Sequence, residues 1–261
     1  MPEKKKEQVL SVRDLDITFK TTAGPVHAIR GVNIDLYKGE TVALVGESGS
    51  GKSVTMKAAM GILAQNAIVN SGSIQFSYHH ADGSPETVDL LQKDKKWIRR
   101  HINGKRIAMV FQDPMTGTAA TMQIEENLAL AARRGKHRTL RIGITKAERE
   151  QYRELLKTLD LGLEDRLTAR VGLLSGGQRQ ALTLLMATMN NPKLLLLDEH
   201  TAALDPKTAL KVLTLSARIV EENHLTTMMI THNMKDAIKY GNRLIMMHEG
   251  HIIYDLSLIH I

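Results

Sequence analysis

The glycine-rich segment "GESGSGKS", Gly46 to Ser53, constrains the fold of this chain more than any other feature of its sequence. It follows a β-like run, "TVALVG" (41–46), and precedes a helical pattern that places Met56, Ala59 and Met60 on one side. A strand, a glycine loop and a helix in this order fit the phosphate-binding pattern G-x-x-x-x-G-K-[ST]. The sequence therefore predicts an α/β fold of the P-loop NTPase type.

The small residues of this loop leave room for consecutive backbone N–H groups to close around a phosphate, and the start of the helix adds a favourable field. Lys52 is expected to supply a positive charge to the β- and γ-phosphates, and the Ser53 hydroxyl to ligate Mg²⁺. The alternative is a glycine-rich turn that only caps the helix. The predicted ligands are ATP and Mg²⁺, and the candidate nucleotide-binding residues in the loop are Gly46, Glu47, Ser48, Gly49, Ser50, Gly51, Lys52, Ser53 and Val54.

Two acidic residues, Asp198 and Glu199, stand at the end of a second apolar run, "KLLLLDE" (193–199). Ligands of parallel sheets bind at the carboxyl ends of the strands. We expect Asp198 to hold Mg²⁺ through water and Glu199 to act as the general base that orients the attacking water. A strand that ends in two acids is by itself as often a solvated strand exit, but the phosphate loop upstream favours the functional interpretation.

Gln112 in "VFQDP" and His232 in "MITHN" each end a further β-like run. If these runs join the same parallel sheet, both side chains lie at the edge that carries the phosphate loop and can reach a γ-phosphate. Both are therefore candidate catalytic residues, with Lys52 and Glu199, and Gln112 is also a candidate Mg²⁺ ligand. The alternatives are ordinary surface polarity or helix capping, for which the neighbouring Asn233 is well suited.

The segment "LLSGGQRQAL" (173–182) places a second glycine turn directly ahead of an apolar helical stripe. The phosphate loop already surrounds one side of a nucleotide, and a helical region separates this turn from that loop along the chain. A second copy of the protein, packed head to tail, would bring the turn against the γ-phosphate held by its partner. The candidate residues for this contact are Ser175, Gly176, Gly177 and Gln178.

The order of periodic segments predicts one α/β domain with two additions. From Gln112 to about residue 190 the pattern is helical, and the capping-box spacing of Thr145 and Glu148 predicts one helix start there. Asp205 before Pro206 predicts another. We therefore expect an N-terminal antiparallel β subdomain and a helical subdomain inserted at about 113–190. The expected β runs are 9–19, 32–37, 41–46, 106–111, 193–198, 226–231, 243–248 and 251–255.

Length and charge narrow the function further. The 261 residues suit a single domain, expected at 9–255, with a disordered tail at 1–8 and an atypical tail, "LSLIHI", at 256–261. No run approaches the roughly 18 apolar residues of a membrane span and no signal peptide is evident, so a cytosolic location is expected. The formal net charge of +7 is concentrated at 93–106 and 133–141. Such runs can bind nucleic acid or anionic lipid headgroups, or remain solvated; with one Trp and three Phe, no nucleic-acid partner is expected.

Taken together, these motifs resemble those of the ATP-binding-cassette (ABC) transporter family over about residues 9 to 255. "GESGSGKS" matches its Walker A loop, "LSGGQ" (174–178) its signature and "LLLLDE" (194–199) its Walker B strand. Gln112 stands at the Q-loop position, "ALD" (203–205) at the D-loop and His232 at the switch histidine. The resemblance also implies a RecA-like core sheet.

The resemblance implies two further residue roles and one departure from the family pattern. Phe19 matches the aromatic residue that stacks on adenine, although a core role is equally consistent with its position. Asp205 is placed at a dimer interface. His200 follows Glu199 where many relatives have Pro, and this change should leave the chemistry intact.

The implied function is that of the ATP-hydrolysing subunit of a transporter. The segments 28–55 and 107–116 are similar to oligopeptide or dipeptide importers, and the later segments from 117 onward to amino-acid (tryptophan-type) uptake systems. The implied partners are a transmembrane permease, an identical or similar ATPase subunit and an extracytoplasmic substrate-binding protein, with the chain held peripherally on the cytoplasmic face of the membrane. The alternatives are an ABC-type ATPase that acts on DNA or ribosomes, or an export ATPase.

Overall fold

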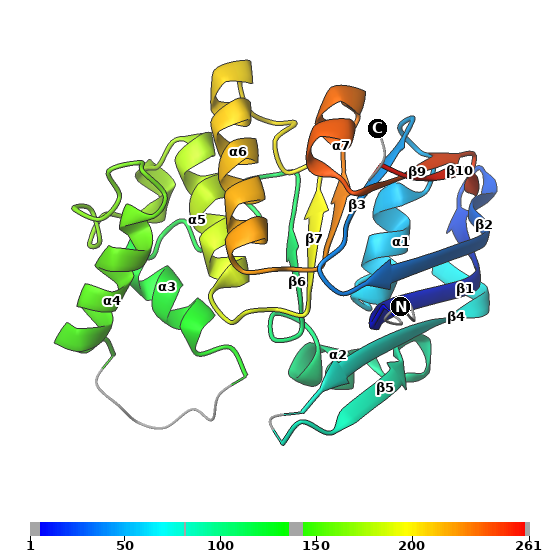
Figure 1. Cartoon of the computed structure of the whole chain (residues 1–261), viewed down its shortest axis with the longest axis horizontal. Coiled ribbons are helices and arrows are strands. Elements are labelled where there is room, and N and C mark those ends of the chain that lie inside the picture. Colours follow the sequence, from blue (N-terminus) through cyan, green and yellow to red (C-terminus); the bar gives the residue numbers. More distant parts are fainter. Residues whose placement is uncertain (1–5, 81, 136–142, 259–261) are drawn as a thin grey trace, which may run out of the picture.

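The computed structural model describes residues 6–80, 82–135 and 143–258, and these residues form two β-sheets with helices around them (Figure 1). The first sheet is antiparallel and has the strand order β2-β1-β4-β5. Its strands are β1 (Gln8–Thr21), β2 (Gly24–Tyr37), β4 (Ala67–His79) and β5 (Pro85–Asp89). This sheet confirms the predicted N-terminal antiparallel β subdomain.

The second sheet has six strands in the order β10-β9-β3-β8-β7-β6. All neighbours pair in parallel except β9 and β10, which form an antiparallel edge. The strands are β3 (Thr41–Gly46), β6 (Ile107–Val110), β7 (Leu194–Asp198), β8 (Thr227–Ile230), β9 (Arg243–His248) and β10 (His251–Ser257). Every residue of β6, β7 and β8 is buried, as the continuous apolarity of these runs predicts for a sheet covered on both faces.

Helices cover both faces of the parallel sheet. On one side, α1 (Lys52–Ala59) lies between this sheet and the antiparallel sheet, and the short α2 (Lys95–His101) lies at the edge beside β4 and β5. On the other side lie α3 (Ile124–Ala132), α4 (Lys146–Lys157), α5 (Gly176–Thr188), α6 (Pro206–Glu222) and α7 (Met234–Tyr240). Two short 3₁₀ turns, η1 (Leu90–Gln92) and η2 (Val171–Leu173), complete the elements.

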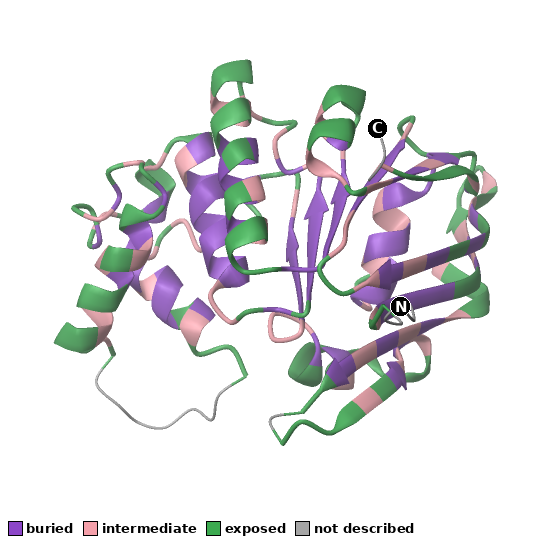
Figure 2. Cartoon of the chain, in the orientation of Figure 1, coloured by how far each residue is buried: buried purple, intermediate pink, exposed green. Residues whose placement is uncertain are grey.

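The alternation of side chains along each central strand divides the buried residues between two cores (Figure 2). In β3, Val42 and Leu44 belong to the core beneath the antiparallel sheet, while Ala43 and Val45 belong to the core beneath α3–α6. A one-residue slip would exchange the two sets. Because β3, β6, β7 and β8 pair in parallel, their carboxyl ends all lie at one edge of the sheet.

The helix starts follow the predicted capping residues. Thr145 caps α4 in a capping box with Glu148, Asp205 caps α6, and Asn233 caps α7. Each side chain accepts a hydrogen bond from a backbone N–H of the first turn, which otherwise has no partner within the helix.

Strands β4 and β5 were not among the predicted strands. The face of β4 that points away from the core is exposed, so its sequence lacks a continuous apolar run. Gly72 is required within it, because its φ is +105° and a Cβ there would lie 2.6 Å from the Cα of Leu15. The expected N-terminal tail, 1–8, contains the first residue of β1, Gln8. The expected C-terminal tail, 256–261, contains the last two residues of β10, which ends at Ser257.

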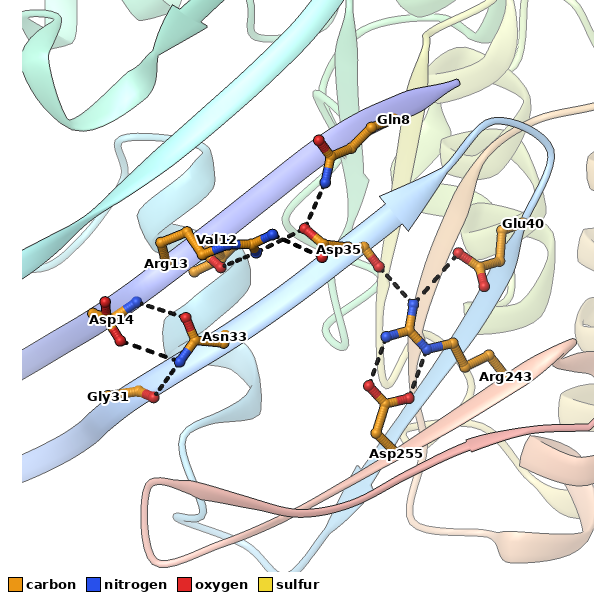
Figure 3. Close-up of polar contacts among 10 residues, drawn as sticks. All are labelled: Gln8, Val12, Arg13, Asp14, Gly31, Asn33, Asp35, Glu40, Arg243 and Asp255. Atoms are coloured by element: carbon orange, nitrogen blue, oxygen red, sulfur yellow. Dashed lines mark hydrogen bonds and ion pairs between the residues drawn. The ribbon is translucent and has the colours of Figure 1, made fainter. Parts of the chain in front are cut away.

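Arg243, at the start of β9, joins the two sheets (Figure 3). Its guanidinium forms two hydrogen bonds of 2.6 Å to Asp255 on β10 and one of 2.7 Å to the backbone oxygen of Asp35 on β2. Glu40 lies 3.7 Å away. The carboxylate of Asp35 pairs in turn with Arg13 on β1 at 2.7 Å. The network links strands of both sheets on the side away from α5 and α6.

Candidate functional site

The glycine loop lies between β3 and α1, at the carboxyl edge of the parallel sheet, as predicted. Two of its glycines are required by close contacts. Gly46 has a φ of +146°, and a Cβ there would lie 2.1 Å from the backbone oxygen of Met247. Gly51 has a φ of +100°, and its Cβ would lie 2.5 Å from the Cδ1 of Ile29. Any other residue at either position would displace the loop from β9 or β2.

Lys52 is directed back over this loop. Its Nζ donates hydrogen bonds to the backbone oxygens of Gly46 at 2.8 Å and Glu47 at 2.7 Å, and lies 3.3 Å from the Ser50 hydroxyl. The residue is only 4% exposed. Burial lowers the pKa of Lys52 from its ordinary value, and the carboxylates of Glu199 and Asp198 oppose that effect. The loop therefore holds a cation at the centre of a ring of small residues.

Ser53, at the start of α1, meets Asp198, at the end of β7. The Ser53 hydroxyl donates a hydrogen bond of 2.6 Å to Oδ1 of Asp198. The two residues are far apart in the chain and come together because β7 and β3 present their carboxyl ends at the same edge. A hydroxyl and a carboxylate side by side are oxygen donors of the kind that Mg²⁺ prefers. Within the described ranges, no group of three His, Cys, Asp or Glu residues could hold a metal alone.

Glu199 and His232 form the second pair of the site. Nε2 of His232 lies 2.6 Å from Oε1 of Glu199, and its Nδ1 lies 3.2 Å from the backbone oxygen of Gly46. Glu199 has a φ of +48°, a left-handed conformation that is rare for a residue other than glycine. Backbone strain of this kind is often found at functional sites. The structure thus brings the predicted Glu199 and His232 together beside the phosphate loop.

Gln112 and Phe19 are less closely tied to this cluster. Gln112 is exposed and lies two residues beyond β6, at the same sheet edge. Phe19 is partly buried on β1, where it pairs with Val26 and Ala67 and packs against the core. Its position is consistent with both the core role and the adenine-stacking role.

The signature turn is built as an N-cap. The Ser175 side chain accepts a hydrogen bond from the Gln178 N–H, and the Gln178 side chain accepts one from the Ser175 N–H. Ser175 and Gly176 are exposed, whereas Gly177 is buried against α6, where a Cβ would lie 2.1 Å from the Cγ2 of Thr208. Because α6 follows the carboxyl end of β7, the turn faces the same side of the molecule as the phosphate loop.

Within one chain the turn and the loop are nevertheless separated. Figure 1 shows α5 and α1 on opposite flanks of the strands β6, β7 and β3. The described contacts agree, since α5 packs on α3, α6 and β6, and α1 on β2, β3 and β7. Each chain therefore presents the phosphate loop and the signature turn as two separate features on one side.

Two interactions near the site were not predicted from the sequence. Arg179, directly after the signature, is 4% exposed and donates to the Thr118 hydroxyl at 2.6 Å and to the Met115 backbone oxygen at 3.1 Å. His200 is fully buried and lies 2.8 Å from the Ser216 hydroxyl on α6. A charged residue in a helix otherwise buried on all sides is a signal that could have identified Arg179, because such a residue needs partners.

A family model described as ABC transporter matches residues 29–202, which is well over half of the chain. This chain belongs to the ABC transporter family.

Curated ABC relatives match almost the whole chain. A tyrosine transport ATP-binding protein of Clostridioides difficile is 37% identical over 250 residues, covering 95% of this chain and 92% of the relative. The dipeptide transport ATP-binding protein DppD of Bacillus subtilis is 37% identical over 248 residues, covering 94% of this chain and 69% of the relative. Similarity to both kinds of ABC protein thus extends across both halves of the chain.

Solved ABC cassettes share the fold. A dimeric cassette, MJ0796, in a post-hydrolysis state bound to ADP and Pi is 25% identical with a TM-score of 0.76, covering 95% of this chain and 98% of that one. The chain is accordingly an ATP-hydrolysing ABC cassette, as the motifs predicted. Among the described residues, none of its helices is long and apolar enough to cross a membrane.

Proposed function

We propose that two copies of this cassette, or this cassette and a similar one, hydrolyse ATP at shared sites and drive peptide or amino-acid uptake through a permease. The observation that carries the proposal is the separation of Ser175 from the phosphate loop within one chain, although both face the same side. A head-to-tail partner supplies the missing half of each site. The dimeric relative bound to ADP and Pi supports this arrangement.

Nucleotide binding is assigned to the loop Gly46–Val54. The backbone N–H groups at the start of α1 bind phosphate oxygens, and the Lys52 ammonium neutralises charge on the β- and γ-phosphates. Because its present partners are loop carbonyls, Lys52 is already held at the mouth of the loop. Phe19 is proposed to stack on the adenine, and Asp205 to lie at the dimer interface near the turn of its neighbour.

Hydrolysis is assigned to Glu199 and His232. In this role Glu199 accepts a hydrogen bond from the attacking water, and the His232 imidazole, 2.6 Å from its Oε1, holds the carboxylate in place. Gln112 reaches the same edge from β6 and contributes to positioning. The partner's Ser175–Gln178 turn then encloses the γ-phosphate from the opposite side, where its N–H groups stabilise developing negative charge.

Ser53, Asp198 and Gln112 are the residues proposed to hold Mg²⁺. The contact between the Ser53 hydroxyl and the Asp198 carboxylate at the start of α1 supports this assignment, because it brings two oxygen donors together. The remaining ligands would be phosphate oxygens and water, which Mg²⁺ commonly retains. When bound, the ion neutralises charge on the β- and γ-phosphates.

The permease is proposed to dock near Gln112. A cavity of about 270 Å³ lies beside the segment that follows β6 and is lined by Phe111, Thr116, Gly117, Asn103 and Thr183, among others. It is bounded by both the core sheet and the helical subdomain, so a helix seated there contacts both parts. Met115, at the edge of this segment, is 62% exposed.

The cargo class rests on the tyrosine- and dipeptide-transport names of the relatives. With that class we propose an extracytoplasmic substrate-binding protein as a further partner, and a location on the cytoplasmic face of the membrane. Co-purification with permease candidates, followed by membrane fractionation, tests this part of the proposal. Purification with ribosomes or DNA instead would contradict it.

Mixing two inactive variants tests the shared site. Lys52→Ala disables the phosphate loop and Ser175→Arg disables the signature turn, so each homodimer is inactive. In a mixed dimer, one site carries both changes and the other carries neither, so ATPase activity should return when the two variants are combined. A mixture of Lys52→Ala with Glu199→Gln is the matched control, because both changes act on the same side of a site and no intact site forms. Activity in Ser175→Arg alone would contradict the proposal.

A further inference from the structure

We propose that a basic surface centred on α2 binds the headgroups of anionic phospholipids. This "α2 basic surface" consists of Lys93, Lys95, Lys96, Arg99, Arg100, Lys105 and Arg134. This binding is separate from the proposed function, which supplies only the proximity of the protein to a membrane. The adsorption itself requires neither ATP nor a permease.

The surface is exposed and dense in charge. Lys93, Lys95, Lys96, Arg99 and Arg100 are all exposed on or just before the short helix α2, which lies beside β4 and β5 and is coloured largely as exposed in Figure 2. The carboxylate of the only acidic residue among 93–101, Asp94, accepts a hydrogen bond from the Trp97 N–H as the helix cap.

Two separate segments add cations beside α2. A Cβ built on Gly135 would lie 1.5 Å from the Cε of Lys105, and one built on Gly104 would lie 2.9 Å from the Cδ of Arg134. The loop after α2 and the segment after α3 therefore cross, with Lys105 against Gly135 and Arg134 against Gly104. Bringing like charges together destabilises the fold unless an anion compensates.

The described part of the chain provides no such anion. Some cations elsewhere pair with carboxylates, for example Arg13 with Asp35, Arg133 with Glu148 and Arg149 with Glu125. None of the seven cations of the α2 basic surface lies within ion-pair distance of a carboxylate among the described residues. The charge is thus available to an external partner.

The shape and composition favour a lipid surface over other anions. Five of the cations are exposed on and just before α2, Lys105 is half-buried, and Arg134 lines the cavity proposed for the permease. Five exposed cations spread along a helix and the loop before it suit many mobile headgroups. Trp97, the only tryptophan of the chain, lies among them with His101 stacked at 4.7 Å and the Lys93 ammonium 5.0 Å from its ring. Tryptophan is enriched at membrane interfaces. Asn103 and Gly104, which follow α2, also line the cavity proposed for the permease, so this surface would face the same membrane.

Vesicle binding by the full chain tests the proposal. Large vesicles of phosphatidylcholine alone are compared with vesicles that also contain phosphatidylglycerol, at low and high ionic strength. The wild type should bind only the anionic vesicles, and added salt should release it because it screens the charges. Each lysine or arginine near an anionic surface contributes about 1 kcal/mol, so Lys95→Gln/Lys96→Gln/Arg99→Gln should weaken binding on the order of 100-fold.

The matched control is Lys146→Gln/Lys211→Gln/Lys239→Gln, which removes the same charge from exposed positions on α4, α6 and α7. It should retain most of the affinity, and both triple variants should keep wild-type ATPase activity and thermal midpoint. Equal vesicle binding by the α2 variant and the wild type would overturn the proposal, as would equal binding of the wild type to both kinds of vesicle. Loss of permease association with vesicle binding intact would assign the surface to an acidic segment of the permease and also overturn it. The Lys52→Ala variant should lose ATPase activity and still bind anionic vesicles. This result would show that lipid binding does not depend on ATP hydrolysis.

Discussion

Nε2 of His232 lies 2.6 Å from Oε1 of Glu199, and this contact joins the ends of two neighbouring strands of the parallel sheet, β8 and β7. The imidazole also reaches the backbone of Gly46, so one side chain connects the candidate general base to the phosphate loop. A nucleotide that displaces the loop would therefore also move His232 and the Glu199 carboxylate that it contacts.

Glu199→Gln should bind ATP but hydrolyse it at least about 100-fold more slowly, because the amide cannot act as a base. A stable dimer should accumulate with ATP and be visible by size-exclusion chromatography. His232→Ala should reduce turnover without removing ATP binding. A Glu199→Gln variant that stays monomeric with ATP would contradict the shared-site assignment.

His200 should act as a positioning residue for Glu199. Ser216 donates its one hydroxyl hydrogen to the backbone oxygen of Val212 on α6. The Ser216 oxygen is then left to accept, so the His200 Nε2–H donates to it. Burial lowers the pKa of His200 to about 4, which keeps it neutral. We expect His200→Asn to lower kcat on the order of tenfold with little change in KM for ATP, because its shorter amide cannot reach Ser216.

His200→Gln, whose amide can occupy the Nε2 position, should recover most of that activity. Ser216→Ala should reproduce the loss, and combining it with His200→Asn should add little more. If the variants lower the thermal midpoint and change kcat and KM together, His200 has only a packing role.

Arg179 should transmit movement between the signature helix and the segment after Gln112. Its guanidinium bonds to Met115 and Thr118, and the neighbouring Gln180 amide donates to the Phe111 backbone oxygen at 2.9 Å. Arg179→Met keeps the volume and removes these bonds. We expect a several-fold loss of permease-stimulated ATPase activity, with ATP affinity maintained. Equal losses of basal and stimulated activity would argue against this role.

Gly177→Ala should disturb the signature turn through its contact with α6. The added methyl group would lie 2.1 Å from the Cγ2 of Thr208, and overpacking of this kind costs about 1–3 kcal/mol. ATPase activity and the free energy of unfolding should both fall. Thr208→Ser removes the opposing methyl group, so the double variant should recover stability in urea unfolding. Failure of this rescue would show that the contact with Thr208 does not limit the turn.

Asp35 should contribute a pH-dependent part of the stability. Burial alone would raise the pKa of Asp35, but hydrogen bonds from Arg13 and Ser11 and the charges of Arg13 and Arg243 together lower the pKa below the usual value. The stabilisation is therefore complete above the unfolded pKa and is lost as the pH falls through the folded one. Asp35→Asn should lower the free energy of unfolding by about 1–2 kcal/mol at pH 7. The difference should close in acid; a gap that stays constant below pH 3 would contradict this origin.

Much of the site followed from local sequence because its chemistry is local. The glycine pattern of Gly46–Ser53, the caps at Thr145 and Asp205, and the continuous apolar runs of β7 and β8 are each recognised from a few consecutive residues. Strands β4 and β5 escaped prediction because a half-exposed antiparallel strand has a weak apolar pattern. Each is ordered by its neighbour in the sheet, β4 by β1 and β5 by β4.

The sequence alone determined which residues are able to bind a phosphate, to cap a helix or to lie within a covered sheet, since these properties belong to the backbone and to near neighbours. Only the tertiary structure decided which distant groups meet: Ser53 with Asp198, Arg179 with Met115 and Thr118, and Lys105 with Gly135. The reason is that such contacts depend on the register of the sheet and on how the helices pack against it, and both are set by burial summed over the whole chain.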